Sequence, residues 1–247
     1  MIKDLFNGMS SYLTAIQLTA KHRLWGYFVI PAIVTILLGA AIFYGAWQIS
    51  GNIGNYISNI YPWEWGSAYV DEIGQVFGGL LVAALGLILF KNLVVALASP
   101  FMSFLSEKIE RILYGGESPK FTTQQFISDL VRGIRIAIRL VVRELLFTIL
   151  LFLVGLIPVF APVIPFALFA VQSYYAGAGN MDFTLERYYR VRGSVQFVRR
   201  NRGLAVGNGI IYLLLYFTVI GFVFALPLST IAGTVEAMKK IKKEEVA

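Results

Sequence analysis

Long apolar stretches separated by basic segments dominate the pattern of this chain. Residues 24–49 carry no charge, and a second apolar stretch starts near Ile73 and keeps a helical pattern to 112. Because a helix of about 20 apolar residues crosses the hydrocarbon of a bilayer, these stretches predict membrane-spanning helices over 24–49 and 73–112. The end of the second is polar and should project from the membrane. The pattern predicts an all-α integral membrane protein, with residues 1–247 in one membrane domain.

One lysine interrupts the second predicted span. Lys91 follows the uncharged residues 73–90, which just suffice to cross the bilayer. We expect Lys91 at the inner boundary, with its stem along lipid and its amine among the headgroups. A lysine that lines a pore is the alternative, since charged residues inside membranes mark ion pathways.

The stretch 145–175 is uncharged and is broken near its middle by Pro158, Pro162 and Pro165. Proline blocks helix continuation and disfavours helix in the residue before it. As a helix, the arm Leu145–Ile157 would be about 20 Å long at about 1.5 Å per residue, which is short for hydrocarbon about 30 Å thick. We therefore expect a helical hairpin that penetrates the membrane partway and returns to the same side.

A second apolar region, 204–235, is interrupted by Gly221 and Pro227 and is similar in arm length. Paired interrupted segments are typical of transporters built from repeats. Whether this second hairpin crosses fully stays open, because 210–226 alone approaches the length of a span. Hairpin tips inside lipid must be buried in protein, line a water-filled route or be covered in an oligomer, since lipid cannot satisfy their backbone groups.

Two amphipathic segments, 1–23 and 126–144, accompany the apolar stretches. Segment 1–23 has its apolar residues on one face and is expected to lie in the membrane interface. Segment 126–144 carries arginines at a spacing of three to four, which places them along one helical face: Arg132, Arg135, Arg139 and Arg143. This face either binds lipid phosphates or forms a positive ladder that guides an anion towards the first hairpin.

The placement of charge predicts the orientation in the membrane. The chain has 21 lysines and arginines, and none of them lies in the loop 50–72. All except Lys91 lie in the other polar segments. Lysine and arginine accumulate in cytoplasmic segments. Both termini and both ends of each hairpin are therefore expected on the cytoplasmic side.

Composition narrows the class of function. Only 14% of the residues are charged and the mean hydropathy is +0.71, whereas soluble domains carry about 25% charged residues. There is no cysteine, the single histidine is His22, and no phosphate-binding loop follows a predicted strand. We therefore expect no enzyme activity, no cofactor and no metal. Without a recognition motif, the net charge of +7 fits loop cations facing anionic lipid better than nucleic acid.

Several short motifs follow one another along the chain. They are Phe28–Pro31 at the first span, Ser99-Pro100-Phe101 before Glu107 and Glu110, the proline-broken hairpin, Asp182-Phe183, and Arg199–Arg202 before Gly207-Asn208-Gly209. Over nearly the whole chain, their order resembles the CysZ family of bacterial sulfate permeases, which is related to the etoposide-induced 2.4 membrane proteins. The resemblance implies an all-helical oligomer with two long transmembrane helices and two partly penetrating hairpins.

The resemblance also implies a function and a place for the anion. It implies uptake of sulfate or a similar oxyanion across the bacterial cytoplasmic (inner) membrane, supplying sulfur for cysteine synthesis. It places anion binding on an arginine pair directly before the first span. This chain departs from the pair, with Trp25, Gly26 and Tyr27 in the immediate approach and Lys21, His22 and Arg23 further back. With Arg135 and Arg139 of the arginine face, these three basic residues are the candidate anion-binding residues, since cationic side chains donate charge-assisted hydrogen bonds to oxyanions.

Acidic residues near the end of the second span are a further candidate site. Glu107 and Glu110 match acidic positions on the central helices of the family, which implies a role in the pore. Read from the chain alone, they form ion pairs on the helix surface with neighbours such as Lys108 or Arg111.

A second function stays open beside transport. The same arginines suit a non-transporting membrane scaffold or lipid-interacting protein. The expected partners are the anion, anionic lipids and further copies of the chain, without nucleic acid.

Overall fold

The structure is a computed structural model in which all regular secondary structure of the described residues is helical. It describes the backbone of residues 1–60, 68–115, 122–155, 157, 159–218 and 221–246, and their side chains except 43, 45–60, 68–85, 87, 125, 222 and 246. The helices are α1 (Ile2–Lys21), α2 (Gly26–Ile60), α3 (Ala68–Tyr114), α4 (Thr123–Gly155), the 3-10 helix η1 (Ala161–Val163), α5 (Ile164–Leu185), α6 (Val191–Arg200), α7 (Arg202–Tyr216) and α8 (Gly221–Val246).

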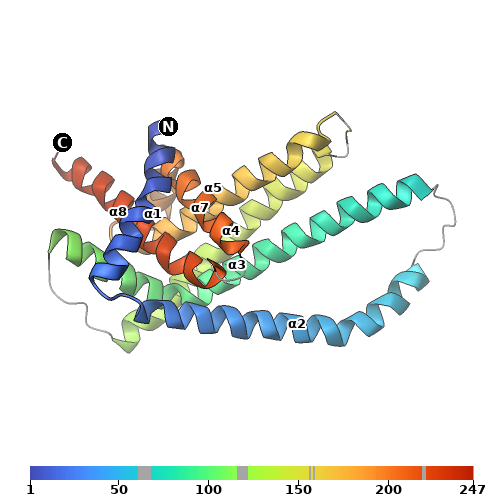
Figure 1. Cartoon of the computed structure of the whole chain (residues 1–247), viewed down its shortest axis with the longest axis horizontal. Helices are drawn as coiled ribbons and strands as arrows, with labels where there is room; N and C mark the ends of the chain where they lie inside the picture. Colours follow the sequence, from blue (N-terminus) through green and yellow to red (C-terminus); the bar gives the residue numbers. More distant parts are fainter. Residues whose placement is uncertain (61–67, 116–121, 156, 158, 219–220, 247) are drawn as a thin grey trace.

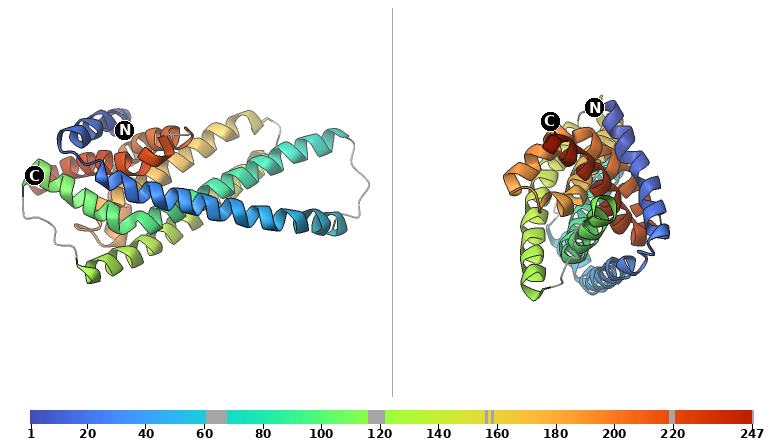
Figure 2. Two further views of the ribbon diagram at one scale, coloured as in Figure 1. Left: turned by 60° about the horizontal axis from the view of Figure 1, so that its bottom comes forward. Right: turned by 90° about the vertical axis from the view of Figure 1, so that its left-hand side faces the viewer.

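A compact body and two long helical pairs make up the molecule (Figure 1). Helices α1, α7 and α8 gather at the end that holds both termini, whereas α2 with α3 and α4 with α5 extend away from it (Figures 1 and 2). Contacts of α7 with α5, α1 and α8 hold the body together, and those between α5 and α7 are the most extensive. Helix α3 packs along α4 and reaches α8. Both extended pairs are therefore anchored in one base.

Helix α3 contains the clearest span candidate. Within the described residues, Ile88–Tyr114 is the one helix long and apolar enough to cross a membrane. A second candidate arises if α1 and the adjoining Gly26–Ile42 of α2, which are bent by 114°, count as one broken span. The predicted spans 24–49 and 73–112 fall almost entirely within α2 and α3. The side chains of 45–85 lie outside the described residues.

Helices α4 and α5 form a hairpin at the proline-broken stretch. The chain turns between Gly155 and Ile164, with Pro162 and Pro165 in the first positions of η1 and α5, where a missing N–H removes no helical hydrogen bond. Pro158 lies outside the described residues. Helix α4 is continuous from Thr123, so the predicted basic segment 126–144 and the first hairpin arm are one helix, because no proline separates them.

The two hairpin regions have different surroundings. On the outer face of α4, Leu146, Leu150 and Leu153 are about 60% exposed, a pattern that suits lipid rather than water. In the second region, Leu213 of α7 and Ile231 of α8 are completely buried in the body. The region 204–235 therefore forms much of the core, whereas 145–175 presents an apolar outer face.

Glycines allow α5 and α7 to approach closely. A Cβ atom on Gly177 would overlap the carbonyl oxygen of Ala205, and one on Gly209 would overlap that of Ser173. Only glycine permits such contact between two helix backbones. The α5–α7 crossing is therefore fixed by backbone packing.

Asn208, between Gly207 and Gly209, links four helices. Its Nδ2 donates to the carbonyl of Ser229 on α8 at 3.0 Å, and its Oδ1 accepts from Asn180 Nδ2 on α5 at 3.0 Å. The hydroxyl of Tyr12 on α1 donates to the Asn208 carbonyl at 2.8 Å. Since buried polar groups are costly unless paired, these hydrogen bonds help to specify how the body packs, although Oδ1 of Asn180 has no partner among the described residues.

Candidate functional site

The basic cluster before α2 lies in the turn that follows α1. Lys21 ends α1, His22 is its C-cap, and Arg23 adopts a left-handed backbone with φ 52°. All three side chains are exposed, and none forms an ion pair within the described residues. The structure keeps these three candidates together, at a sharp bend between α1 and α2, and apart from the cavities described below.

The four arginines of α4 have different environments. Arg132 faces two carboxylates, with Nη2 3.8 Å from Asp182 Oδ2 and Nε 3.4 Å from Glu186 Oε2. Arg135 is exposed, whereas Arg139 and Arg143 are half-buried and line a cavity. The structure therefore divides the arginine face between an ion-pair cluster and a cavity.

The cavity lined by Arg139 and Arg143 has a volume of about 400 Å³ and lies between α4, α5 and α6. Arg199 of α6 adds a third cation, Asp182 adds a carboxylate, and the rest of the wall is aromatic, aliphatic and hydroxyl in character. Its other lining residues are Ile136, Leu140, Phe147, Tyr174, Tyr175, Ala178, Val191, Ser194, Val195 and Val198. We refer to it as the basic cavity. Among the anion-binding residues expected from the sequence, only Arg139 lies there.

A second, smaller cavity of about 160 Å³ is mainly polar. It is lined by Ser103, Glu107, Ser128, Asp129, Arg132, Glu186 and Arg187. Glu107 from the predicted acidic pair thus faces residues of α4 and of the segment after α5. In its wall, the Ser103 hydroxyl donates a hydrogen bond to Glu186.

Burial changes the ionisation of the carboxyls beside Arg132. It raises the pKa of Asp182 to about 6, against the opposing effects of Arg132 and of the nearby Ser194 hydroxyl. It raises the pKa of Glu186 to about 8, although the hydrogen bond from Ser103 favours the charged form. At neutral pH Glu186 is therefore mostly protonated, and the charge of Arg132 is left to neutralise Asp182.

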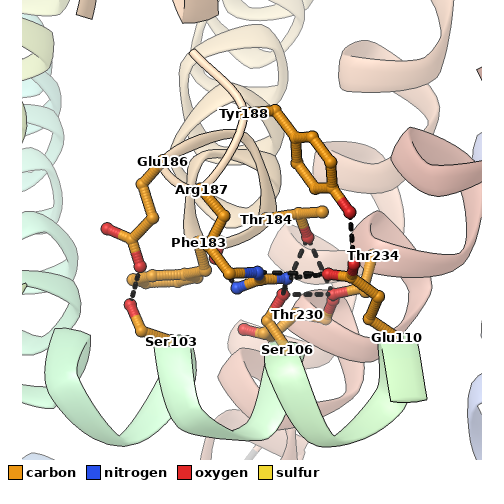
Figure 3. A network of polar contacts seen from close by, with 10 residues as sticks. All are labelled: Ser103, Ser106, Glu110, Phe183, Thr184, Glu186, Arg187, Tyr188, Thr230 and Thr234. Atoms are coloured by element: carbon orange, nitrogen blue, oxygen red, sulfur yellow. Dashed lines mark hydrogen bonds and ion pairs between the residues drawn. The ribbon is translucent and has the colours of Figure 1, made fainter. Parts of the chain in front are cut away.

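Glu110 forms an ion pair with a residue distant in sequence (Figure 3). Arg187 donates to Glu110 Oε2 from Nη2 at 2.8 Å and from Nε at 3.1 Å. The hydroxyl of Tyr188 donates to the other carboxylate oxygen. Glu110 is thus paired with the segment after α5 rather than with Lys108 or Arg111. Nη1 of Arg111 is buried without a hydrogen-bond partner among the described residues.

Three hydroxyls extend this network into the body (Figure 3). The oxygens of Ser106, Thr184 and Thr234 lie 2.8–3.0 Å from one another, and Arg187 Nη2 donates to Ser106 at 3.0 Å. They come from α3, α5 and α8. Because a satisfied polar network rigidifies its surroundings, Arg187 couples the end of α5 firmly to α3 and α8.

The amine of Lys91 is buried inside the protein. Its amine donates to Glu144 Oε1 of α4, and Asn92 Nδ2 donates to Glu144 Oε2 at 3.2 Å. The Lys91 and Glu144 side chains are 3% and 0% exposed. The expectation that its stem lies along lipid and its amine among headgroups is therefore wrong, because the side chain is buried and a carboxylate on the neighbouring helix neutralises its charge inside the protein.

Unpaired hydroxyls accompany this ion pair. Thr148 follows Glu144 by one turn of α4, and its buried Oγ1 has no hydrogen-bond partner among the described residues. On α7 the hydroxyls of Tyr212 and Tyr216 are likewise buried and unpaired, with ring centroids 5.6 Å apart. Glu144 acts electrostatically on Tyr212. We refer to the pair and these hydroxyls, which α3, α4 and α7 contribute, as the polar centre. The Tyr216 ring lies 6.2 Å from that of Phe90, the chain neighbour of Lys91.

The sequence interpretation missed several of these residues, chiefly Glu144, Arg187 and Arg199 as partners or cavity residues. For Glu144 a signal exists in the chain. It is the sole carboxylate in 130–181, and Lys91 is the sole charged residue in 73–106. Two isolated opposite charges in apolar segments predict a pair, since neither is tolerated alone in hydrocarbon. No local signal selects Arg199, whose role depends on the packing of α6 against α5.

The described residues do not meet the requirements of a metal site. No group of three or more His, Asp or Glu side chains there is placed to hold a metal ion. The chemistry offered by the described sites is that of charge pairs, guanidinium groups and hydroxyls.

A family comparison covers all of these sites. Residues 11–227 match the sequence model of a family described as sulfate transporter CysZ/etoposide-induced protein 2.4. The matched region starts within α1 and ends within α8. It contains both cavities and the polar centre around Lys91 and Glu144.

Proposed function

The chain belongs to the sulfate transporter CysZ/etoposide-induced protein 2.4 family, a family of membrane proteins and transporters rather than enzymes, and on this premise we propose that it is a permease or channel for sulfate or a similar oxyanion. We propose a bacterial cytoplasmic membrane location with both termini in the cytoplasm, in keeping with the lysine and arginine distribution. In this setting it supplies sulfur assimilation.

The polar centre around Lys91 and Glu144 is the observation that carries this proposal. Charges within apolar membrane helices are costly and accompany substrate or ion pathways. A buried ion pair adds little stability compared with apolar residues of the same volume. The three hydroxyls of the polar centre have donors that the described residues leave unused. Unused donors around a cation are what a desolvated anion requires.

The centre can exchange partners as an anion passes. An oxyanion is attracted to the ammonium of Lys91 and accepts hydrogen bonds from the hydroxyls of Thr148, Tyr212 and Tyr216 in place of its hydration shell. Glu144 competes for the same ammonium, so the anion is held weakly enough to leave. Permeation needs binding of this balanced kind.

Exposed cations supply the approach. We propose that Lys21, His22 and Arg23 in the α1–α2 turn, and Arg135 on α4, raise the local anion concentration through their field. Their exposure without ion pairs within the described residues supports this role. The Glu110–Arg187 pair, by contrast, ties α3 to the body and serves the packing around the route.

Oligomer formation follows from the same membrane setting. The apolar outer face of the α4–α5 hairpin must contact lipid or other subunits, since water would leave it unfavourably exposed. We propose that copies of the chain assemble through their membrane-embedded faces, which also covers hairpin tips that lipid cannot satisfy.

Uptake by reconstituted protein tests the proposal. Purified protein in liposomes is expected to take up labelled sulfate faster than empty vesicles. Tyr212→Phe and Thr148→Val should lower the rate while the unfolding temperature stays equal or rises, because each removes a buried hydroxyl that has no described partner. Tyr44→Phe, at an exposed position of α2, is the control and should keep the rate.

Two outcomes would contradict transport. Folded wild-type protein without uptake beyond empty vesicles would leave the scaffold or lipid-interacting function as the better description. Unchanged uptake in Tyr212→Phe and Thr148→Val would leave the permease function standing. It would contradict the proposal that the anion passes through the polar centre.

A further inference from the structure

The basic cavity holds more positive charge than the protein neutralises. Arg139 and Arg143 come from successive turns of one face of α4, and Arg199 faces them from α6. None of the three forms an ion pair within the described residues. The one carboxylate in the wall, Asp182, is engaged by Arg132 at 3.8 Å. The cavity therefore retains an excess of cationic donors.

A hydroxyl donor lies in the same wall. Ser194 of α6 is 3% exposed, and its Oγ has no hydrogen-bond partner of normal geometry among the described residues. From α5, Tyr174 lies within the electrostatic reach of Arg143 and Arg199. Guanidinium groups with hydroxyl donors form the usual recognition set for a phosphate or sulfate group.

The size of the cavity distinguishes between ligands with that group. Its volume is about 400 Å³, within the range of pockets that hold organic molecules, about 300–1,000 Å³. A bare tetrahedral oxyanion fills the space of only a few water molecules, at about 30 Å³ each. Much of the remaining wall is apolar and suits hydrocarbon, as with Phe147, Leu140 and Val195. The ligand should therefore carry an apolar part.

The position of the cavity indicates where such a ligand comes from. Phe147 lines the cavity and is itself 50% exposed. It lies on α4 one turn before Leu150 and belongs to the exposed apolar surface that continues through Leu150 and Leu153. In the orientation proposed above, the cations lie towards the cytoplasmic end of this surface, where the headgroups of a bilayer are expected.

We propose that the basic cavity is a binding site for an anionic phospholipid, with Arg139, Arg143 and Arg199 holding the phosphate and Phe147 contacting the start of an acyl chain. The site is separate from the Lys91–Glu144 centre. A lipid bound here joins α4, α5 and α6 and fixes the depth of the hairpin in the inner leaflet.

Lipid retention measured by native mass spectrometry tests this site on the full-length protein. In detergent with equal amounts of phosphatidylglycerol and phosphatidylcholine, the wild type should retain phosphatidylglycerol selectively. Arg139→Gln and Arg199→Gln should each lower its retention about fivefold, the effect of one basic residue near a lipid surface. The exposed Arg135→Gln, on the same helix but outside the cavity, is the matched control and should have no effect.

Competition separates a lipid from a free anion. Sodium sulfate or phosphate at the ionic strength of a sodium chloride control should displace no more lipid than the chloride does. Two results together would overturn the lipid assignment in favour of a free oxyanion site. They are displacement of the lipid by sulfate but not by chloride, and protection of the wild type from unfolding by sulfate as strong as that by the lipid. Equal losses of lipid retention in Arg135→Gln and Arg139→Gln would overturn the assignment of the lipid to the basic cavity. They would indicate that lipid is held by diffuse attraction to the protein surface.

A conservative variant guards against loss of fold. Arg143→Lys keeps the charge but not the planar fork, so it should stay folded and show an intermediate retention. Sulfate uptake is measured separately, in liposomes that contain only phosphatidylcholine and therefore no anionic phospholipid. Its result does not depend on the lipid retention measured by mass spectrometry. Failure of the lipid site is therefore distinguishable from failure of the permease proposal.

Discussion

Lys91 of α3 donates a hydrogen bond to Glu144 of α4 inside the protein, where neither side chain reaches the surface. They lie 53 positions apart in the chain, and each is isolated among apolar neighbours. The pair links the span candidate to the hairpin helix. Because it is neutral as a unit, it allows two charges to lie where lipid would admit neither.

Removal of one partner should be more damaging than removal of both. Lys91→Met leaves the Glu144 carboxylate buried with Asn92 as its remaining donor, and should cost about 3–5 kcal/mol. The double variant Lys91→Met with Glu144→Leu should recover most of that loss. Denaturant unfolding in detergent measures the difference. If the double variant were no more stable than Lys91→Met, packing rather than charge would dominate this contact.

The recovered double variant also separates stability from transport. It should remain folded but take up sulfate no faster than empty vesicles, because the polar centre has lost its cation and its carboxylate. Retained uptake in this folded variant would contradict a route through the centre.

The close crossing of α5 and α7 should not tolerate a methyl group. Gly177→Ala places Cβ onto the backbone oxygen of Ala205, so the helices must separate, at a cost of about 1–3 kcal/mol typical of overpacking. Gly86→Ala is the control. Its added Cβ meets nothing within 4 Å, and alanine favours helix by up to about 1 kcal/mol. Thermal unfolding should therefore move in opposite directions for the two variants.

The carboxyl of Glu186 should make stability depend on pH. Its pKa is about 8 in the folded protein, above the ordinary value of 4.5, because of burial. The folded state therefore holds a proton that the unfolded state releases, and stability should fall as pH rises between about 4.5 and 8. Glu186→Gln removes this contribution, and its unfolding temperature should vary less over that window. A pH profile as steep as that of the wild type would contradict the assignment.

Arg187 should not be replaceable by lysine. Its guanidinium contacts Glu110 through two nitrogens and reaches Ser106 and the Phe183 carbonyl as well. Lysine keeps the charge but cannot make these contacts together, so Arg187→Lys should cost about 1–3 kcal/mol. Arg190→Lys, at an exposed position nearby, is the matched control and should unfold like the wild type. Equal stability of Arg187→Lys would show that charge alone suffices.

The sequence pattern predicts the helical character and the membrane class well, because apolar length and helical period are local properties. The resemblance to the CysZ family is confirmed by the match over 11–227, and the absence of enzyme character agrees with that family. The partial penetration of the hairpins, the orientation and the oligomer stay predictions.

The clustered prolines of 145–175 correctly predict the turn between α4 and α5, since proline disfavours helix continuation. Single prolines are less informative: Pro31 and Pro100 lie inside α2 and α3. The expectation that Pro227 interrupts 204–235 is wrong, because it lies inside α8.

The site depends on contacts between distant segments and was less predictable. The spacing of the α4 arginines indicates one face, but not that Arg132 pairs with Asp182 while Arg139 lines a cavity. That division depends on where α5 and α6 pack. For Lys91, the isolated carboxylate of Glu144 in the apolar part of α4 indicates an ion-pair partner. For Glu110, the partner is Arg187 rather than the cations nearby in sequence. Spacing along the chain does not reveal this, because the pairing depends on how the end of α5 packs against α3.

The crossing of α5 and α7 limits how this protein can move. Where backbone meets backbone at Gly177 and Gly209, a slide of one helix along the other by a single residue would bring a side chain into a space that holds none. Shear between these helices is therefore blocked, and hinge bending remains as the way to open a path. The rocking elements would be the outer parts of the α2–α3 and α4–α5 pairs, pivoting on a base that does not deform.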